Sequence, residues 1–367
     1  MKTALVYDWF SETGGGGEKA FEAVYNLFPS PIYTLLKDTA SLNKTSFARE
    51  NIHASFIQKF PRALKYYRYY FPFYPLAIEK FDLSNYDLII SCSHCVAKGV
   101  LTHAEQLHLC YCYTPVRYAW DLTHQYLGSQ KKWNNLAHFF LHYLRQWDVQ
   151  SARRVDGFAA ISHYIARRIQ KIYGRKAAVI YPPVDTNFFT IKTKKKDFYV
   201  AASRLVPYKK MDLIAEAFSQ MPDKKLVIIG DGPDLQKVKS KSAKNIEILG
   251  YQSDNVLKKY LQNAKAFIFA AIEDFGILPV EAQSCGTPVI AFGKGASLET
   301  VKNNETGIFF QEQSPFAIQE AVRRFEQLEF DPTQIRAHAE TFNLDRFSRE
   351  FKAWVQSERA KNRTKME

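Results

Sequence analysis

Short apolar runs alternate with longer stretches of helical pattern along most of this chain. The runs are residues 4–7, 88–92, 107–113 and 158–161, followed by 198–201, 226–229, 246–249, 266–269 and 289–292. Strands that alternate with helices are typical of a doubly wound parallel sheet. The pattern therefore predicts an α/β chain with two such sheets in tandem.

The stretch between the two series of runs marks a boundary. Residues 181–185 are rich in proline and residues 192–197 are rich in lysine, which is typical of a hinge. With 367 residues, the chain is also too long for one ordinary core. We expect Rossmann-like domains at 1–182 and 183–345 and a final segment at 346–367. Because ligands bind at the carboxyl ends of such sheets, we expect the active site in the cleft between the domains.

Charge and hydropathy narrow the class of protein. No apolar run reaches about 18 residues, so no membrane-spanning segment is expected. Residues 1–8 meet a charge too early for a signal peptide, which predicts a cytoplasmic protein. The formal net charge of +13 favours anionic partners. The chain has no zinc-finger, basic-zipper or RNA-binding signature, so nucleic acid is not expected. An anionic membrane surface and a diphosphate-bearing substrate explain the charge better, and solvated surface lysines account for part of it.

Four of the five cysteines raise the question of a metal. Cys92 and Cys95, together with Cys110 and Cys112, have a spacing that a zinc site could use. Both pairs lie at the ends of apolar runs, where small buried thiols are common. We therefore expect reduced, structural cysteines and no metal.

The sequence EDFGILPVE, from Glu273 to Glu281, follows an apolar run and carries the clearest chemical signal. If it were helical throughout, the two carboxylates would lie about 12 Å apart along the axis, too far for a hydrolase acid/base pair. Pro279 suits a first helical turn, which puts Glu281 near the third helical position and leaves Glu273 in the loop. The unpaired N–H groups of this helix start would bind an anion. They belong to Gly276, Ile277 and Leu278. A nucleotide-diphosphate sugar fits, with phosphate in the middle and hydroxyls at both ends.

This segment resembles the family 4 retaining glycosyltransferases of the GT-B fold, whose mark is two glutamates separated by seven residues. The resemblance extends to residues 203–213 (SRLVPYKKMDL), 227–233 (VIIGDGP) and 13–18 (TGGGGE), in the family's order across nearly the full length. It implies two Rossmann-like domains facing a cleft, with a C-terminal helix that crosses back to the first domain. Residues 344–355 have the amphipathic pattern for that helix, and we expect residues 357–367 to form a mobile tail.

The resemblance also implies roles for single residues. Arg204 and Lys209 would hold the donor diphosphate, Glu281 the ribose hydroxyls, and Glu273 and His94 the donor sugar. Fixed cations stabilise the charge that develops on the departing phosphate, so neither a metal nor another cofactor is expected. Each role has a plainer alternative: surface cations, acids favoured by a helix start, or a structural histidine.

The first domain offers a glycine loop as a donor-binding candidate and two acceptor-side candidates. Gly15 and Gly16 belong to a glycine loop whose backbone could approach a phosphate or the acceptor closely. The segment from Tyr113 to Asp121 resembles one in bacterial mannosyltransferases that build lipopolysaccharide and exopolysaccharide, although those relatives often have a histidine in place of the tyrosine. Arg117 could bind an acceptor phosphate and Asp121 could orient a hydroxyl. The alternative is a salt bridge between the two.

Residues 59–81 hold nine aromatic and five basic residues against one acid. This mixture suits the interface of a membrane, where aromatic rings enter the headgroup layer and cations meet anionic lipid. It also suits a core helix with one solvated side. We expect a retaining enzyme, peripheral at the inner face of a membrane, that transfers mannose from GDP-mannose to a sugar on a lipid-linked or polysaccharide acceptor. A UDP-sugar as donor is one alternative, and a non-catalytic nucleotide- or polyanion-binding protein is another.

Overall fold

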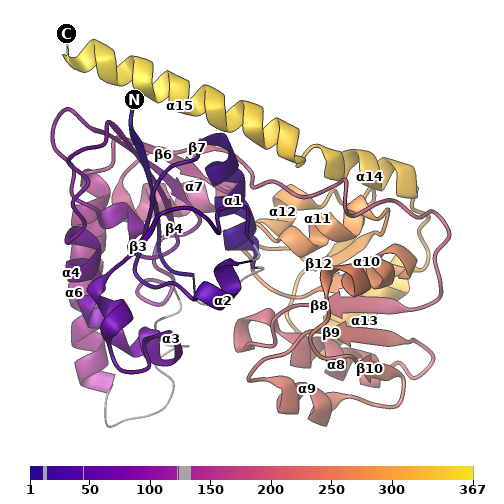
Figure 1. The fold of residues 1–367 in the computed structure, drawn as a ribbon. Coiled ribbons are helices and arrows are strands. Elements are labelled where there is room, and N and C mark those ends of the chain that lie inside the picture. Colours follow the sequence, from indigo (N-terminus) through magenta and orange to yellow (C-terminus); the bar gives the residue numbers. More distant parts are fainter. Residues whose placement is uncertain (11–14, 44, 122, 124–133, 367) are drawn as a thin grey trace. The chain divides into compact units, whose positions relative to one another are not determined.

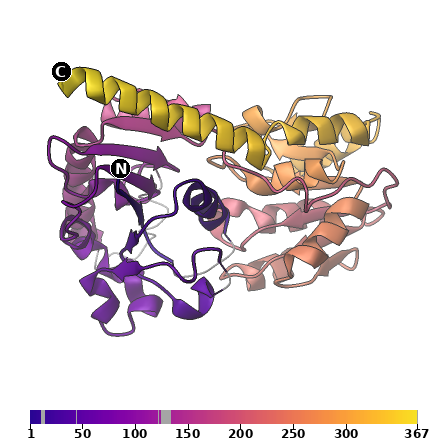
Figure 2. The same cartoon turned by 45° about the horizontal axis from the view of Figure 1, so that its top comes forward.

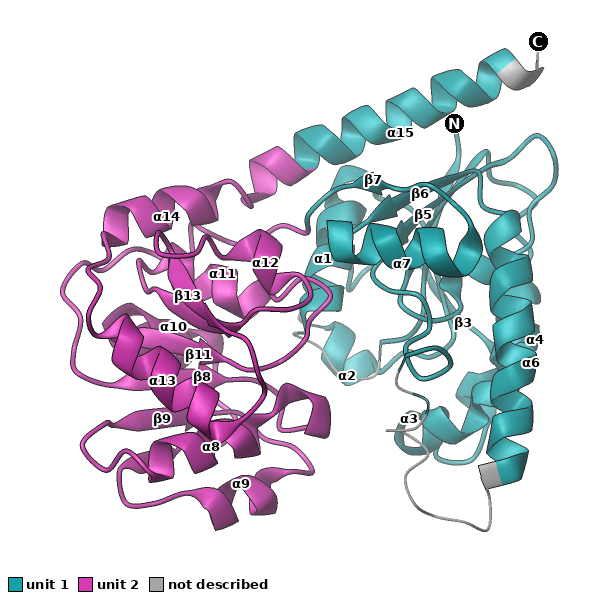
Figure 3. Cartoon of the chain, turned by 180° about the vertical axis from the view of Figure 1, so that it is seen from behind, with its two compact units in different colours: residues 1–181, 348–367 teal, residues 182–347 magenta. Residues whose placement is uncertain are grey.

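The computed structural model describes residues 1–10, 15–43, 45–121, 123 and 134–366. The chain forms two compact units, one of residues 1–181 and 348–367 and the other of residues 182–347 (Figure 3). The sequence analysis places these boundaries after residues 182 and 345.

Unit 1 is built on a parallel sheet of seven strands in the order β3-β2-β1-β4-β5-β6-β7 (Figure 1). The strands are β1 (Thr3–Tyr7), β2 (Ile32–Thr34), β3 (Ile52–Ala54), β4 (Leu88–Ser93), β5 (Leu107–Cys112), β6 (Gly157–Ala160) and β7 (Ala178–Val179). Every neighbouring pair is parallel. The predicted doubly wound sheet is thus confirmed for this unit.

Helices cover both faces of this sheet. They are α1 (Gly16–Leu27), α2 (Thr39–Leu42), α3 (Ala63–Tyr66), α4 (Tyr74–Glu79), α6 (Asn134–Arg153) and α7 (His163–Tyr173), with 3₁₀ turns η1 (Phe56–Lys59), η2 (Tyr67–Phe73) and η3 (Ala97–Gly99). One core joins alternate residues of the central strands, such as Val6 and Ile89, to Ile78 of α4 and Leu144 of α6. Because both faces are buried, the strands read as continuous apolar runs.

Unit 2 repeats this plan with six strands in the order β10-β9-β8-β11-β12-β13. The strands are β8 (Tyr199–Ala202), β9 (Leu226–Ile229), β10 (Ile246–Ile248), β11 (Ala266–Phe269), β12 (Val289–Phe292) and β13 (Gly307–Phe310). The helices are α8 (Met211–Ser219), α9 (Leu235–Lys241), α10 (Asp254–Asn263), α11 (Ile277–Ser284), α12 (Ser297–Thr300), α13 (Pro315–Phe325) and α14 (Pro332–Glu340), with the 3₁₀ turn η4 (Pro207–Lys209).

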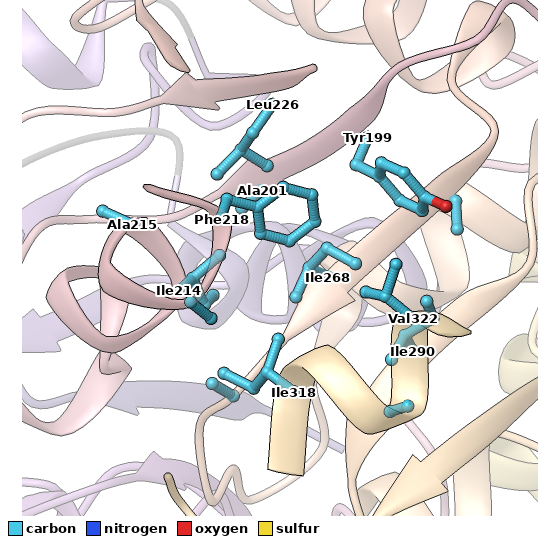
Figure 4. Close-up of a cluster of buried hydrophobic side chains, with 14 of the residues drawn as sticks. Tyr199, Ala201, Ile214, Ala215, Phe218, Leu226, Ile268, Ile290, Ile318 and Val322 are labelled. Atoms are coloured by element: carbon cyan, nitrogen blue, oxygen red, sulfur yellow. The ribbon is translucent and has the colours of Figure 1, made fainter. Parts of the chain in front are cut away.

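The core of unit 2 shows why these strands alternate. Ala201 of β8 and Ile268 of β11 face a cluster formed with Ile214 of α8 and Ile318 of α13 (Figure 4). The residues between them along the same strands, such as Phe267, join a second cluster on the opposite face. Side chains of a strand point alternately to its two faces, so one strand supplies both cores.

The last helix, α15 (Leu344–Met366), corrects one prediction, since the chain stays helical through the segment expected to be a mobile tail. Its residues from 348 onward belong to unit 1. Phe351 packs with its ring centroid 6.1 Å from that of Phe28 and 5.4 Å from that of Tyr111. Figures 1 and 2 show the helix passing over the β6–β7 side of this unit. The helix continues to its end because its exposed positions are rich in good helix formers. An ion pair of 2.7 Å between Glu358 and Lys361 also stabilises it.

Candidate functional site

The predicted catalytic residues lie at the topological switch point of each sheet. This is the place where the connections that leave two neighbouring strands run in opposite directions along the sheet. In unit 1 this point is between β1 and β4, and in unit 2 between β8 and β11. His94 directly follows β4. Arg204 and Lys209 follow β8, and Glu273 follows β11. Ligands of doubly wound sheets bind just beyond the carboxyl ends of strands at such points.

The loop that carries Arg204 rests on the glycine-rich turn after β9. Leu205 donates its N–H to the carbonyl of Asp231 over 2.9 Å. A Cβ on Gly230 would lie 1.8 Å from the carbonyl oxygen of Ser203, and one on Gly232 would lie 2.4 Å from that of Leu205. Both glycines have positive φ, at +140° and +154°. Two positions that admit only glycine thus let one loop press against the backbone of the next.

Lys209 and Glu273 contact each other directly. Nζ of Lys209 lies 2.6 Å from Oε1 of Glu273, and both side chains are less than a fifth exposed, at 17% and 15%. The backbone of Glu273 is held as well, because its carbonyl accepts the N–H of Ala296 over 3.0 Å. Gly295, at φ +73°, allows this approach, since a Cβ there would lie 2.8 Å from that carbonyl oxygen. Both residues are predicted from the sequence to bind the donor, but the ion pair between them is not.

Helix α11 begins at Ile277, after Gly276 at φ +82°. Pro279 is therefore the third helical residue and Glu281 the fifth, not the third as predicted, because the helix starts two residues before the proline. Glu273 remains in the loop as expected. Helical geometry leaves the N–H groups of the first turn without an intrahelical acceptor, so those of Gly276 to Leu278 can bind an anion. Glu281 is 4% exposed, one turn further along.

In unit 1 the structure reveals a residue that the sequence analysis missed. Asp8 follows β1, is completely buried, and accepts four backbone N–H groups from the loop after β4. Its Oδ2 also lies 3.1 Å from Nδ1 of His94. The only signal in the sequence is an acid directly after an apolar strand.

The predicted glycine loop, residues 13–18, is described from Gly15 onward, and residues 13 and 14 lie outside the described residues. Gly15 caps α1 and Gly16 is its first residue, so the helix starts two residues before Glu18. A Cβ on Gly17 would lie 2.9 Å from the hydroxyl of Tyr7. Burial, with the charges of Glu18 and Asp8, raises the pKa of that hydroxyl well above its usual value. It therefore stays protonated.

The predicted acceptor-side segment is tied to α7. Arg168, on that helix, forms an ion pair with Asp121 and donates to Oγ1 of Thr114. The salt bridge considered for Asp121 was one with Arg117, whereas the ion pair that the structure shows joins Asp121 to Arg168. Arg117 lies one turn before, where its carbonyl accepts the N–H of Asp121 over 3.0 Å.

Residues 59–81 fold into η1, α3, η2 and α4, and part of the segment is core, as expected for a helical segment with one solvated side. Tyr67, Tyr74 and Ile78 belong to the core of unit 1. Large apolar side chains also stand exposed there, namely Leu64, Tyr69, Phe73 and Leu76. Exposed Leu136, Phe139 and Tyr143 recur at helical spacing on α6, and the ring of Phe71 lies 6.2 Å from that of Phe140 on the same helix. We call these seven exposed side chains the apolar patch.

All five cysteines are free and buried. Within the described ranges, no three or more His, Cys, Asp or Glu side chains are placed to hold a metal ion. None of the described helices is long and apolar enough to cross a membrane.

Two family models match this chain. Residues 39–188 match Glycosyltransferase Family 4, and residues 184–342 match Glycosyl transferases group 1. Together the two matches run from residue 39 to residue 342.

Among curated relatives, a GDP-mannose-dependent monoacylated alpha-(1-6)-phosphatidylinositol monomannoside mannosyltransferase of Corynebacterium glutamicum is 32% identical over 178 residues, 40% of this chain and 47% of that protein. A GDP-mannose-dependent alpha-(1-6)-phosphatidylinositol monomannoside mannosyltransferase of Mycolicibacterium smegmatis is 28% identical over 187 residues, 41% of this chain and 48% of that protein. The chain spans about half the length of the curated relatives it matches.

Among solved structures, Anabaena HepE in complex with UDP superposes with a TM-score of 0.69 at 16% identity, over 97% of this chain and 100% of that one. At this identity the likeness concerns the fold.

Proposed function

We propose that this chain, which belongs to the family 4 glycosyltransferases of the GT-B fold, is a retaining mannosyltransferase. It transfers mannose from GDP-mannose to a sugar on a lipid-linked glycan. The observation that carries this proposal is the arrangement at the switch point of unit 2. There two cations follow one central strand, and an acid and a helix start follow its neighbour.

In this proposal Arg204 and Lys209 bind the diphosphate and stabilise the negative charge that grows on it as the bond to the sugar breaks. Backbone N–H groups at the start of α11 stabilise the same negative charge. Glu281 binds the ribose hydroxyls and Glu273 faces the sugar. Because Lys209 and Glu273 are already paired, the lysine is held near its working position before the donor arrives. The cations supply the positive charge that other transferases take from a metal.

The identities of the base and the sugar of the donor are inferred from the relatives. Both mannosyltransferases named above are GDP-mannose-dependent, which supports GDP-mannose here. The UDP in the HepE structure keeps a UDP-sugar as the second candidate.

A thermal-shift panel of GDP- and UDP-sugars tests the choice of donor. A ligand at about 100 times its dissociation constant stabilises the fold by about 2.7 kcal/mol. We expect GDP-mannose to raise the melting temperature and Glu281→Gln to reduce that rise. Stabilisation by UDP-sugars alone would replace GDP-mannose by the second candidate. A panel without any stabilising nucleotide sugar would reject the proposal.

We also propose that the lipid-linked acceptor is met at an anionic membrane surface, on which the apolar patch docks. Lys65 and Arg68, both exposed, flank the patch and lie over the rings of Tyr66 and Tyr67 at 5.4 and 5.2 Å. Each basic residue near an anionic surface contributes about 1 kcal/mol. Aromatic rings beside such cations suit the headgroup layer.

Co-sedimentation with vesicles of varied anionic lipid content tests this docking. Lys65→Glu/Arg68→Glu should lower the partition coefficient at least about tenfold. The matched control is Lys239→Glu/Lys244→Glu, which makes the same change of charge at exposed positions of unit 2. Equal loss in both variants would indicate a general charge effect, and no loss in either would reject docking through this segment.

A further inference from the structure

Asp8 is placed to hold both the loop after β4 and the ring of His94. Its Oδ2 accepts the N–H of His94 over 2.6 Å and that of Cys95 over 3.0 Å. Its Oδ1 accepts those of Val96 over 2.5 Å and Ala97 over 2.7 Å. Both oxygens face N–H donors, and the carboxylate is the form that accepts from all of them.

The ring of His94 then has a defined tautomer. A carboxylate can only accept, so Nδ1, 3.1 Å from Oδ2, must carry a proton. In the neutral ring Nε2 is then bare and accepts a hydrogen bond. Two aromatic contacts fix the plane of the ring: the centroid of Trp9 lies 4.5 Å away at 82°, and that of Tyr7 lies 5.7 Å away at 59°. The side chain of His94 is 28% exposed, whereas Asp8 is fully buried.

We infer that Asp8 is a positioning residue of the reaction, which fixes His94 as the Nδ1-protonated tautomer so that Nε2 accepts a hydrogen bond from a hydroxyl of a sugar substrate. This inference rests on the proposed function for the identity of the ligand. The alternative is that Asp8 merely ties two loops together and that the ring contact has no consequence for the sugar.

A double-mutant cycle separates the two. Asp8→Asn keeps the size of the side chain but leaves at least two of the four N–H groups without a carboxylate oxygen, so it perturbs the loop whatever residue 94 is. If Asp8 also acts through the ring, the substitution should lower kcat by about tenfold to a hundredfold in the wild type, the range known for carboxylates that orient a metal-ligating histidine. In a His94→Gln background it should lower kcat by less than about twofold.

The matched control is Asp148→Asn. Asp148 is another fully buried carboxylate of unit 1, which accepts from the indole of Trp120 over 2.8 Å. Asp148 is also ion-paired with Lys98, four positions after His94. Its substitution therefore perturbs the same loop without removing the partner of the His94 ring, and it should have the same effect in both backgrounds. An equal loss for Asp8→Asn in both backgrounds, or no loss in either, would overturn the inference.

A second measurement is made on the wild type and does not depend on how Asp8→Asn folds. Nitrogen-15 shifts of histidine-labelled protein, with His94 assigned by the His94→Gln spectrum, report which ring nitrogen carries the proton. We expect the Nδ1-protonated form at a pH where the ring is neutral, and the Nε2-protonated form would overturn the inference. If the wild type transfers sugar from no donor of the panel, the proposed function fails, and the spectrum still decides whether Asp8 fixes the ring.

Discussion

Gly230→Ala should weaken unit 2 severely, because this glycine allows the turn after β9 to press on the loop that carries Arg204. The expected loss follows from two features. First, φ is +140°, a region that side-chain-bearing residues rarely adopt and that costs about 1–3 kcal/mol. Second, the new Cβ would lie 1.8 Å from the carbonyl oxygen of Ser203, although such contacts are essentially never under 3.0 Å. That carbonyl must retreat by at least the difference, 1.2 Å.

Overpacking of this kind typically costs about 1–3 kcal/mol more. We therefore expect Gly230→Ala to lower the free energy of unfolding by about 2–6 kcal/mol. Gly250→Ala is the matched control. Gly250 lies in the same unit, accepts the N–H of Gly230 over 2.8 Å and has φ +70°, but a Cβ there meets nothing within 4 Å. Its cost should be about 1–2 kcal/mol, from the backbone alone.

Urea unfolding followed by tryptophan fluorescence and by hydrogen exchange of unit 2 peptides measures both variants. The exchange data matter because a chain with two units need not unfold in one step. In Gly230→Ala, exchange should rise most around Arg204, with weaker nucleotide binding as the functional consequence. The reasoning fails if Gly230→Ala is no less stable than Gly250→Ala, since that would mean the two loops do not press together.

Three further predictions concern charges. Lys209→Ala should lower turnover about a hundredfold or more while stability changes little, and near-normal turnover would remove this lysine from the diphosphate site. Glu281→Gln should chiefly weaken GDP binding in calorimetry and Glu273→Gln chiefly turnover; equal loss of GDP affinity would contradict these roles. Burial raises the pKa of the Glu326 carboxyl, but hydrogen bonds from two lysines and Tyr199 outweigh it and hold the pKa at about 2. This contribution, about 1–2 kcal/mol after allowance for solvent screening, is fully present above pH about 4.5 and lost as pH falls towards 2. Glu326→Gln should therefore destabilise the protein at neutral pH but not at pH about 2, as urea unfolding would show.

The sequence predicts the central strands well and the peripheral ones poorly. All nine predicted runs fall on strands. Eight of these strands have a neighbour on each side in their sheet and read as continuous apolar segments, whereas β10, of three residues, is an edge strand. The short strands β2, β3 and β7, at two or three residues each, give no such run. β13 also lay outside the predicted set, although it has four residues. The periodicity of α15 fades after Val355, yet good helix formers continue the helix to its end.

The candidate site is predicted from the sequence only where a motif is local. The segment from Glu273 to Glu281 and the loop after β8 are each contiguous in sequence, and they follow strands β11 and β8, although Glu281 is the fifth helical residue and not the third. Contacts between distant segments were not visible. Asp8 and His94 are 86 positions apart, and the pair of Asp121 with Arg168 joins a loop to a later helix. Such pairs depend on which strands become neighbours, and strand order is a property of the whole sheet.

In each unit an acidic and a basic side chain join the two loops at the switch point, but the order of the two along the chain is reversed. In unit 1 an acid follows the first strand of the pair, and the basic ring of His94 follows its neighbour. In unit 2 the basic Lys209 follows the first strand and the acid Glu273 follows the neighbour. Each pair bridges the two loops at the switch point and so fixes them before any ligand is present. A site whose groups are already held loses little freedom on binding, which is what stabilisation of a developing charge requires. By this reasoning, replacing either partner should disturb the geometry of the other, so the effects of paired substitutions will be strongly non-additive.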